Sequence, residues 1–218
     1  MSEPNTPASS PCLLGELPPE AGGLPDAETR RDVMRWRKAE RARLIALRQA
    51  LPVAARVAAD RALAAELDAR LGTPGGATIA ITWPFKGEPD LRAWAAARRE
   101  GGDRIVLPVV VEKGAPLIFR LWEEGARLAR GVWDIPVPPP EAPEVTPDVV
   151  LSPVVGLGAG TYRLGYGGGF YDRTLARLHA RGHNPRTIAI GYAFQEIPTI
   201  FPLPHDVALG EALLVPCS

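Results

Sequence analysis

The sequence predicts an α/β fold: an α/β sandwich with a mainly parallel, mixed, Rossmann-like sheet. Short apolar runs of strand length recur along the chain, and segments with helical spacing of apolar residues separate most of them. The composition, 46% hydrophobic and 23% charged over 218 residues, fits one globular unit with a sizeable core. In such a fold, ligands bind beyond the carboxyl ends of the strands.

Residues 1–25 differ from the rest, because Pro, Ser, Gly, Glu and Ala dominate them without periodicity. We expect a disordered, Pro-rich tail there and a single domain over 26–218. The start lacks the pattern of a signal peptide, and no run is long enough to span a membrane. Cys12 and Cys217 lie near opposite ends, which indicates free thiols and a cytoplasmic location. The formal net charge is zero, so we expect binding of neither nucleic acid nor membrane, and any recognition of anions must be local. We also expect a monomer.

Two helices open the domain. Residues 26–51 predict a strongly basic helix, and Pro52 ends it. Its arginines would ordinarily be no more than a solvated face. A second helix follows over 54–72, with Leu63, Leu67 and Leu71 on one stripe and Gly72 as its cap.

Strands and helices then alternate. We expect a strand at 77–82 and a helix at 90–102 with Pro89 suited to its first turn. A hairpin at 104–111 and 117–122 precedes an irregular segment at 133–147. The remaining elements are a buried strand at 148–157, a helix at 170–182, and strands at 187–194 and 211–216.

The stretch RLGYGGGFYDR, residues 163–173, lies where a strand gives way to a helix. Exposed main-chain N–H groups and the helix dipole make such a place an anion site, and glycines allow close approach. It is neither a Walker A loop nor G-x-G-x-x-G, so glycine spacing alone leaves a phosphate site and a structural turn about equal. Arg163 and Arg173 flank the glycines and favour phosphate, because guanidinium groups match phosphate oxygens.

Acidic and aromatic residues stand near the same edge of the sheet. Asp172 could interact favourably with the helix dipole or bind Mg²⁺ beside a triphosphate, and Asp206 is a second carboxylate or a surface turn. In WPFKGEPD, Trp83 and Glu88 suit a flat, nitrogen-rich ring, although capping of the next helix is the commoner role for Glu88. His179 and His183 have metal-pair spacing but no third ligand, so helix C-terminal cations are favoured.

Several segments resemble the 5-formyltetrahydrofolate cyclo-ligase family, also called methenyltetrahydrofolate synthetases. PDVVLSPVVGL followed by YRLGYGGGFYDRTLARL is similar to the family signature, and the glycine-rich part is specific to it. ATIAITWPFKGEPDLR, DRIVLPVV, GVWDIPVP and HDVALGE look like further family segments in the right order, so the likeness spans about residues 30–216. The resemblance implies a three-layer α/β sandwich and an irreversible, ATP- and Mg²⁺-dependent conversion of 5-formyltetrahydrofolate to 5,10-methenyltetrahydrofolate, giving ADP and phosphate.

The resemblance also implies roles for individual residues. Arg37 and Arg41 fit the family's basic ATP-binding pair, with Lys38 as the alternative first member. Trp83 and Glu88 fall on folate contacts, Glu88 being the partner of the pterin ring, and Asp172 and Asp206 fall on the magnesium positions. The ATP loop comprises Arg163, Leu164, Gly165, Tyr166, Gly167, Gly168, Gly169, Phe170 and Tyr171, with Arg173 beyond it; its part from Tyr166 to Phe170 also faces the folate.

No protein nucleophile is expected. We hypothesise that the formyl oxygen attacks the γ-phosphate, the other folate nitrogen closes on the activated carbon, and phosphate leaves. One departure stands out, because the family usually reads Phe-Asp where this chain has Leu157 and Gly158. A weakened enzyme, a paralogue with another substrate, and a dispensable position all remain open. The alternatives to the cyclo-ligase are a silent folate- or nucleotide-binding paralogue and another ATP-dependent small-molecule ligase on the same fold.

Overall fold

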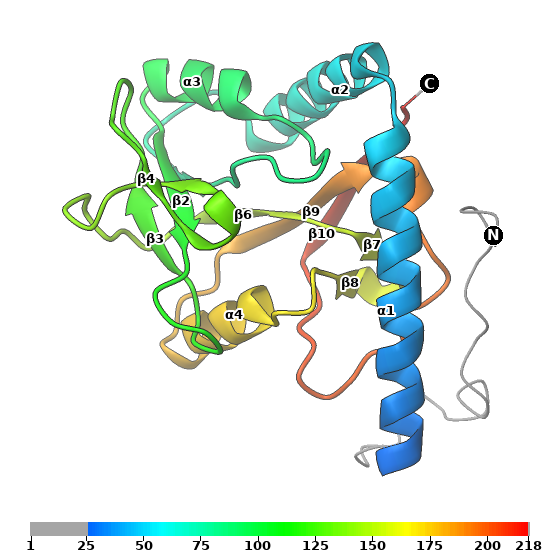
Figure 1. The fold of residues 1–218 in the computed structure, drawn as a ribbon. Coiled ribbons are helices and arrows are strands. Elements are labelled where there is room, and N and C mark those ends of the chain that lie inside the picture. Colours follow the sequence, from blue (N-terminus) through cyan, green and yellow to red (C-terminus); the bar gives the residue numbers. More distant parts are fainter. Residues whose placement is uncertain (1–25, 218) are drawn as a thin grey trace.

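The computed structural model describes residues 26–217, so the tail predicted over 1–25 lies outside the described residues. Its centre is a six-stranded sheet in the order β10-β9-β6-β1-β2-β3 (Figure 1). Every neighbouring pair is parallel except β2 with β3, which form the predicted hairpin. The strands are β1 (Thr78–Ala80), β2 (Arg104–Val109), β3 (Ile118–Leu121), β6 (Val149–Pro153), β9 (Arg186–Tyr192) and β10 (Glu211–Val215). The predicted mixed, mainly parallel sheet is confirmed.

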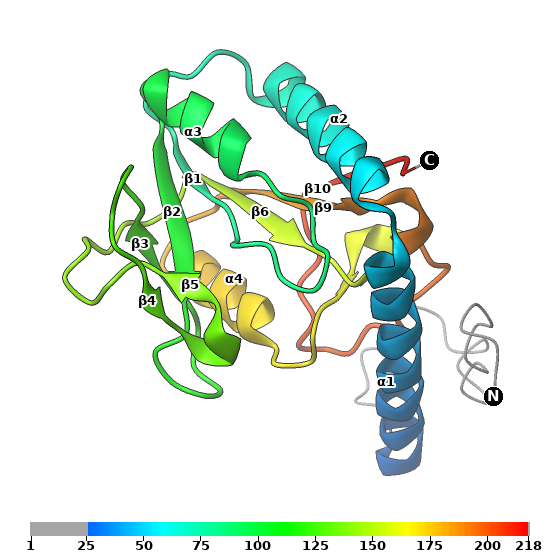
Figure 2. The ribbon, with the colours of Figure 1, turned by 45° about the horizontal axis from the view of Figure 1, so that its top comes forward.

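Helices cover both faces of this sheet, as predicted. The helices α2 (Val53–Leu71) and α3 (Arg92–Glu100) lie on one face, and α4 (Phe170–Ala180) lies on the other (Figures 1 and 2). The long helix α1 (Ala27–Ala50) covers neither face. The arrow of β6 points toward it in Figure 2, which places α1 at the carboxyl-end side of the sheet.

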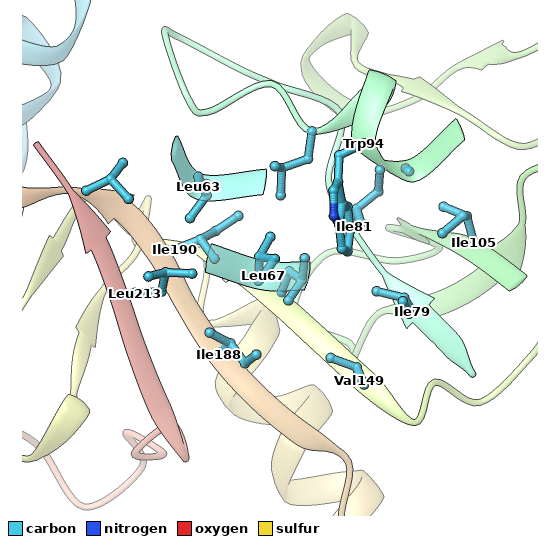
Figure 3. Close-up of a cluster of buried hydrophobic side chains, with 14 of the residues drawn as sticks. Leu63, Leu67, Ile79, Ile81, Trp94, Ile105, Val149, Ile188, Ile190 and Leu213 are labelled. Atoms are coloured by element: carbon cyan, nitrogen blue, oxygen red, sulfur yellow. The ribbon is translucent and has the colours of Figure 1, made fainter. Parts of the chain in front are cut away.

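The strands bury alternate side chains on opposite faces, as the two-residue period of a strand requires. On β1, Ile79 packs toward α2 and α3, whereas Ala80 belongs to the cluster on the α4 side. Figure 3 shows the first of these clusters, in which Leu63 and Leu67 of α2 and Trp94 of α3 meet the strands. Because the strands are packed on both faces, they hold the loops at their carboxyl ends in place.

Helix α1 begins at Asp26, whose carboxylate accepts hydrogen bonds from the main-chain N–H groups of Glu28 and Thr29. The helix ends before Pro52, as predicted. Its Trp36 and Leu44 pack against Leu164 and Ile200 in a third apolar cluster. This cluster attaches α1 to the segment that contains the glycine loop.

The predicted strand over 148–157 is wrong in its second half. β6 ends at Pro153, and Gly156–Leu157 form a separate short strand β7 that pairs with β8 (Arg163–Leu164). The apolar run continues because Val154 and Leu157 pack in the α4-side cluster while Val155 packs in the α1 cluster. Continuous burial therefore comes from two neighbouring cores and not from one straight strand.

Two other sequence expectations also need correction. Pro89 precedes α3 and is not in its first turn, because the helix starts at Arg92, whose N–H group binds the Asp90 carboxylate. The segment 133–147, expected to be irregular, contains β5 (Pro136–Val137), which pairs with β4 (Ala129–Arg130). Within residues 26–217, none of the helices combines the length and apolar character that a membrane span requires.

Candidate active site

A cavity of about 210 Å³ opens at the carboxyl ends of β1, β2 and β6. α1, the loop after β1, the glycine loop and the segment between β4 and β5 all contribute to its wall. Most of the candidate residues named from the sequence line it, namely Arg37, Arg41, Trp83, Glu88, all of 163–172, and Asp206. Lys38 and Arg173 are not part of the wall. The expected position of a ligand site in this class of fold agrees with this geometry.

The glycine loop folds tightly around the start of α4. Gly167 and Gly169 have φ angles of +93° and +62°, a region that residues with a side chain rarely adopt, and Gly169 stands at the N-cap position of α4. The main-chain N–H groups at this helix start have no side-chain cap and form the positive end of the helix dipole. The loop therefore offers the donors that an anion such as phosphate requires.

Arg173 supports the loop from outside the cavity. Its guanidinium donates a hydrogen bond to the carbonyl oxygen of Gly168 and lies over the Phe170 ring, with 5.4 Å from its central carbon to the ring centroid. In this conformation the Arg173 side chain contacts the loop itself, and its expected contact with phosphate stays a prediction. Its position indicates a bracing contribution to the loop conformation.

The basic residues named for the two possible registers of α1 lie in different environments. Arg37 and Arg41 are one turn apart and both line the cavity, whereas Lys38 is exposed to solvent. Arg41 donates from Nε to the Gly165 carbonyl oxygen at 2.6 Å, which ties α1 to the glycine loop. Burial, and then the nearby charge of Arg37, lower the pKa of Arg41. Two cationic side chains therefore lie beside the glycine loop.

The two candidate magnesium carboxylates lie at the same corner of the cavity, each paired with an arginine. Arg163 donates to Asp172 Oδ2 at 3.0 Å, and Arg37 donates to Asp206 Oδ2 at 2.5 Å. The N–H group of Val207 donates to Asp172 Oδ1 at 3.3 Å, which links the two segments. Across residues 26–217 no group of three His, Cys, Asp or Glu residues is suited to a metal. Two carboxylates fit an Mg²⁺ ion that is shared with substrate phosphates and waters, and do not fit an all-protein site.

Glu88 is at the other end of the cavity, almost entirely buried with 6% of its surface exposed. It accepts hydrogen bonds from the Phe85 N–H group at 3.1 Å and from the Tyr166 hydroxyl at 3.0 Å. Burial raises the pKa of Glu88 to about 7, although the Arg48 charge and both hydrogen bonds act to lower it. The N-cap residue of α3 is Leu91, and the Glu88 carboxyl group bonds to Phe85 and Tyr166 and not to the start of the helix, so the interpretation of Glu88 as a helix cap is wrong.

Aromatic rings surround this end of the cavity. Trp133 stacks on Phe85 with centroids 5.8 Å apart and planes 9° from parallel, and Tyr166 meets Phe85 edge to face. Trp83 lines the same cavity and packs against Trp122. Trp133 is 55% exposed and has a φ of +57°. Sequence reasoning missed Phe85 and Trp133, although a tryptophan at the start of a proline-rich segment was a signal that could have found the second.

Leu157 and Gly158, where the chain departs from the family pattern, lie outside the cavity wall. Leu157 is buried in the core on the α4 side. A Cβ atom on Gly158 would lie 2.8 Å from the main-chain nitrogen of Ile200, closer than real Cβ atoms approach. The chain has therefore packed its 199–200 backbone into the space that a side chain at 158 would require.

Comparisons with known proteins agree with this geometry. Residues 33–215 match the model of the 5-formyltetrahydrofolate cyclo-ligase family. A 5-formyltetrahydrofolate cyclo-ligase of Mycolicibacterium smegmatis is 32% identical over 145 residues, which cover 63% of this chain and 73% of the relative. The Escherichia coli protein of the same name is 32% identical over 143 residues, covering 63% and 70%.

Solved structures give the same result. A 5,10-methenyltetrahydrofolate synthetase from Mycoplasma pneumoniae superposes with a TM-score of 0.65 at 26% identity, covering 81% of this chain and 96% of that one. The 5,10-methenyltetrahydrofolate synthetase of Aquifex aeolicus, at 23% identity and a TM-score of 0.67 over 79% and 86% of the two chains, supports the fold. The chain belongs to the 5-formyltetrahydrofolate cyclo-ligase family.

Proposed function

We propose that this protein converts 5-formyltetrahydrofolate to 5,10-methenyltetrahydrofolate and uses ATP, which becomes ADP and phosphate. The observation that carries the proposal is a single cavity with two chemically different ends. One end has the glycine loop with Arg37, Arg41 and Arg163, and the other has Glu88 among aromatic rings. Family membership supports both substrates, because the names of the relatives specify the folate reaction.

The phosphate end suits the triphosphate of ATP. Main-chain N–H groups of the glycine loop would bind phosphate oxygens, and the guanidinium groups of Arg41 and Arg163 would neutralise their charge. Asp172 and Asp206 would hold Mg²⁺ against the phosphates, with their arginine partners released to the same anion. The ion would supply charge neutralisation at the transferring phosphoryl group.

The folate end suits the pterin ring. Phe85, Tyr166 and Trp133 provide flat apolar surface, and Glu88 provides a buried carboxyl group for ring nitrogens. Because the pKa of Glu88 is raised to about 7, both its protonated and ionised forms are populated near neutral pH. The protonated carboxyl group can donate a hydrogen bond to a ring nitrogen, and the ionised group can accept one from a ring N–H group.

The cavity brings the two substrates together without a protein nucleophile. The formyl oxygen attacks the γ-phosphate and releases ADP. The other folate nitrogen then bonds to the activated formyl carbon and loses its proton, and phosphate departs from that carbon with the formyl oxygen and this proton. The protein contributes by orienting the formyl group toward the phosphate and by stabilising negative charge on the transferring group.

Purified protein supplied with 5-formyltetrahydrofolate, ATP and Mg²⁺ tests the proposal directly. We expect the absorbance of the methenyl product to rise only when all three are present. Absence of any ATP-dependent absorbance change at high protein concentration would refute the proposed activity.

Leu157 and Gly158 motivate one alternative, a catalytically silent protein that binds folate or nucleotide. Calorimetry that shows binding of both ligands without turnover would favour it. Binding of ATP without binding of any reduced folate would favour another ATP-dependent ligase on this fold. The location of both residues outside the cavity wall supports the active cyclo-ligase instead.

We also propose a cytoplasmic monomer. Cys217 is a free thiol, while Cys12 lies outside the described residues. Size-exclusion chromatography with light scattering will test the oligomeric state.

A further inference from the structure

Arg48 is a fully buried arginine in the last turn of α1. Its guanidinium donates hydrogen bonds to the carbonyl oxygens of Lys86 at 2.9 Å, Val154 at 3.1 Å and Phe85 at 3.4 Å, and to the Tyr166 hydroxyl. Within residues 26–217 no carboxylate lies within ion-pair distance of it. A buried charge without an ionic partner costs free energy, so these contacts indicate a role beyond packing.

The four contacts reach three different segments around the cavity. Lys86 and Phe85 belong to the loop that ends at Glu88, Val154 follows β6, and Tyr166 belongs to the glycine loop. The loop packs closely on the end of α1, since a Cβ on Gly87 would lie 3.2 Å from the Arg48 carbonyl oxygen. One side chain therefore fixes three segments that meet at the folate end.

The contact with Tyr166 also sets the direction of a hydrogen bond. A tyrosine hydroxyl has one proton and can accept through its lone pairs. Arg48 donates to the hydroxyl oxygen, so the single proton of Tyr166 is directed to an acceptor. The nearer acceptor is Glu88 Oε1 at 3.0 Å, compared with the Phe85 carbonyl oxygen at 3.3 Å.

We propose that Arg48 is a positioning residue for the folate end, because it holds the Tyr166 hydroxyl as a donor to Glu88 and fixes the loop that carries this carboxyl group. The inference rests on the proposed function in taking Glu88 as the partner of the pterin ring. Arg48 does not line the cavity. It acts through Tyr166 and the 85–88 loop and does not contact the substrate itself.

The charge of Arg48 acts on Glu88 in the same arrangement. The charged and titratable groups that influence Glu88 are Arg48 from α1 and Tyr166 from the glycine loop, and Glu88 in turn acts on Tyr171 at the start of α4. Arg48 lowers the pKa of Glu88 against the larger effect of burial, which raises it. Without the Arg48 charge, Glu88 would be protonated to higher pH.

The direct test measures the pKa of Glu88 by NMR of protein labelled with ¹³C at the glutamate carboxyl carbons, with Glu88→Gln assigning the signal. In Arg48→Met we expect the pKa of Glu88 to rise by about one pH unit or more, the range for a lost neighbouring charge. Arg48→Lys keeps a charge and should restore most of the wild-type value. Tyr166→Phe removes the hydroxyl and should also raise the pKa of Glu88.

Kinetics provide the second readout. In Arg48→Met, the pH profile of kcat/KM for the folate should shift to higher pH, following the pKa of Glu88. KM for the folate should rise while KM for ATP stays unchanged. Arg98→Met is the matched control, because Arg98 is similarly buried but pairs with Asp103, away from the cavity. It should lower the melting temperature and leave the pH profile unchanged.

The two readouts separate this inference from the proposed function. A wild-type protein without turnover would refute the function, while the NMR titration would still decide the role of Arg48. An unchanged pKa of Glu88 in folded Arg48→Met would overturn the inference. If that variant does not fold, an unchanged pKa in Tyr166→Phe would overturn it equally.

Discussion

Replacement of Glu88 by glutamine changes how the stability of the protein depends on pH. The carboxyl group has an ordinary pKa of 4.5 and a pKa of about 7 in the folded protein, where burial disfavours its charge. The folded state therefore binds a proton more tightly than the unfolded state. In wild-type protein, Glu88 makes the free energy of unfolding fall as pH rises from about 4.5 to about 7.

The expected size follows from the difference of about 2.5 pH units between the two pKa values. Each unit corresponds to about 1.4 kcal/mol, so ionisation of Glu88 costs the folded protein about 3.5 kcal/mol well above pH 7. Below pH 4.5 the group is protonated in both states and contributes no pH dependence. Glutamine does not titrate, so the free energy of unfolding of the variant does not fall in this way as pH rises. The substitution can also change the free energy of unfolding by a constant amount, which does not depend on pH.

Urea unfolding of both proteins between pH 4 and pH 8.5 measures the effect. We expect the stability of Glu88→Gln relative to wild type to increase by about 3 kcal/mol between pH 4.5 and pH 7.5. Glu211→Gln is a control of opposite sign, because the hydrogen bond from Arg186 lowers the pKa of Glu211 and its contribution is lost as pH falls. A difference between wild type and Glu88→Gln that does not vary with pH would refute the assignment of a buried, proton-binding carboxyl group.

Three further predictions concern the cavity and its surroundings. Asp172→Ala should abolish turnover while the protein still unfolds cooperatively, and near-normal turnover would remove Asp172 from the magnesium role. Arg41→Ala should raise KM for ATP about tenfold or more through loss of charged hydrogen bonds, whereas Lys38→Ala, its exposed neighbour, should leave KM unchanged in the same steady-state assay. Gly158→Asp should lower the free energy of unfolding by about 1–3 kcal/mol because of the Ile200 backbone, and a gain in turnover would instead show that a carboxylate is needed there.

The order of strands and helices could be predicted from the sequence because each element carries a local signal. The short apolar run at β1 and the Asp26 and Pro52 boundaries of α1 are examples. The division of 148–157 could not be predicted, since burial in two different clusters gives the same apolar run as one strand. Local pattern records that a residue is buried, and it does not record which partner buries it.

The candidate site shows the same limit. The glycine loop could be named because its residue types and spacing are unusual. Arg41 was named only through the family resemblance, and the resemblance also assigned Glu88 to the folate, since its chemistry alone favoured a helix cap. Arg48 could not be separated from the many arginines of α1, because its distinction lies in contacts with Lys86 and Tyr166, which are 38 and 118 positions away. Arg173 was assigned to phosphate by its place beside the glycines, but its side chain turns back onto the loop.

Helix α1 has a consequence for the evolution of this chain. Arg37, Arg41 and Arg48 are separated by four and seven residues, so they project from one side of a single rigid rod, and the outer two are about 16 Å apart along it. Inserting one residue between Arg41 and Arg48 would turn Arg48 by about 100° away from the loop that carries Glu88. The number of residues between Arg41 and Arg48 is therefore fixed by the distance between the two ends of the cavity that α1 contacts. Substitutions should be tolerated in this segment far better than insertions or deletions.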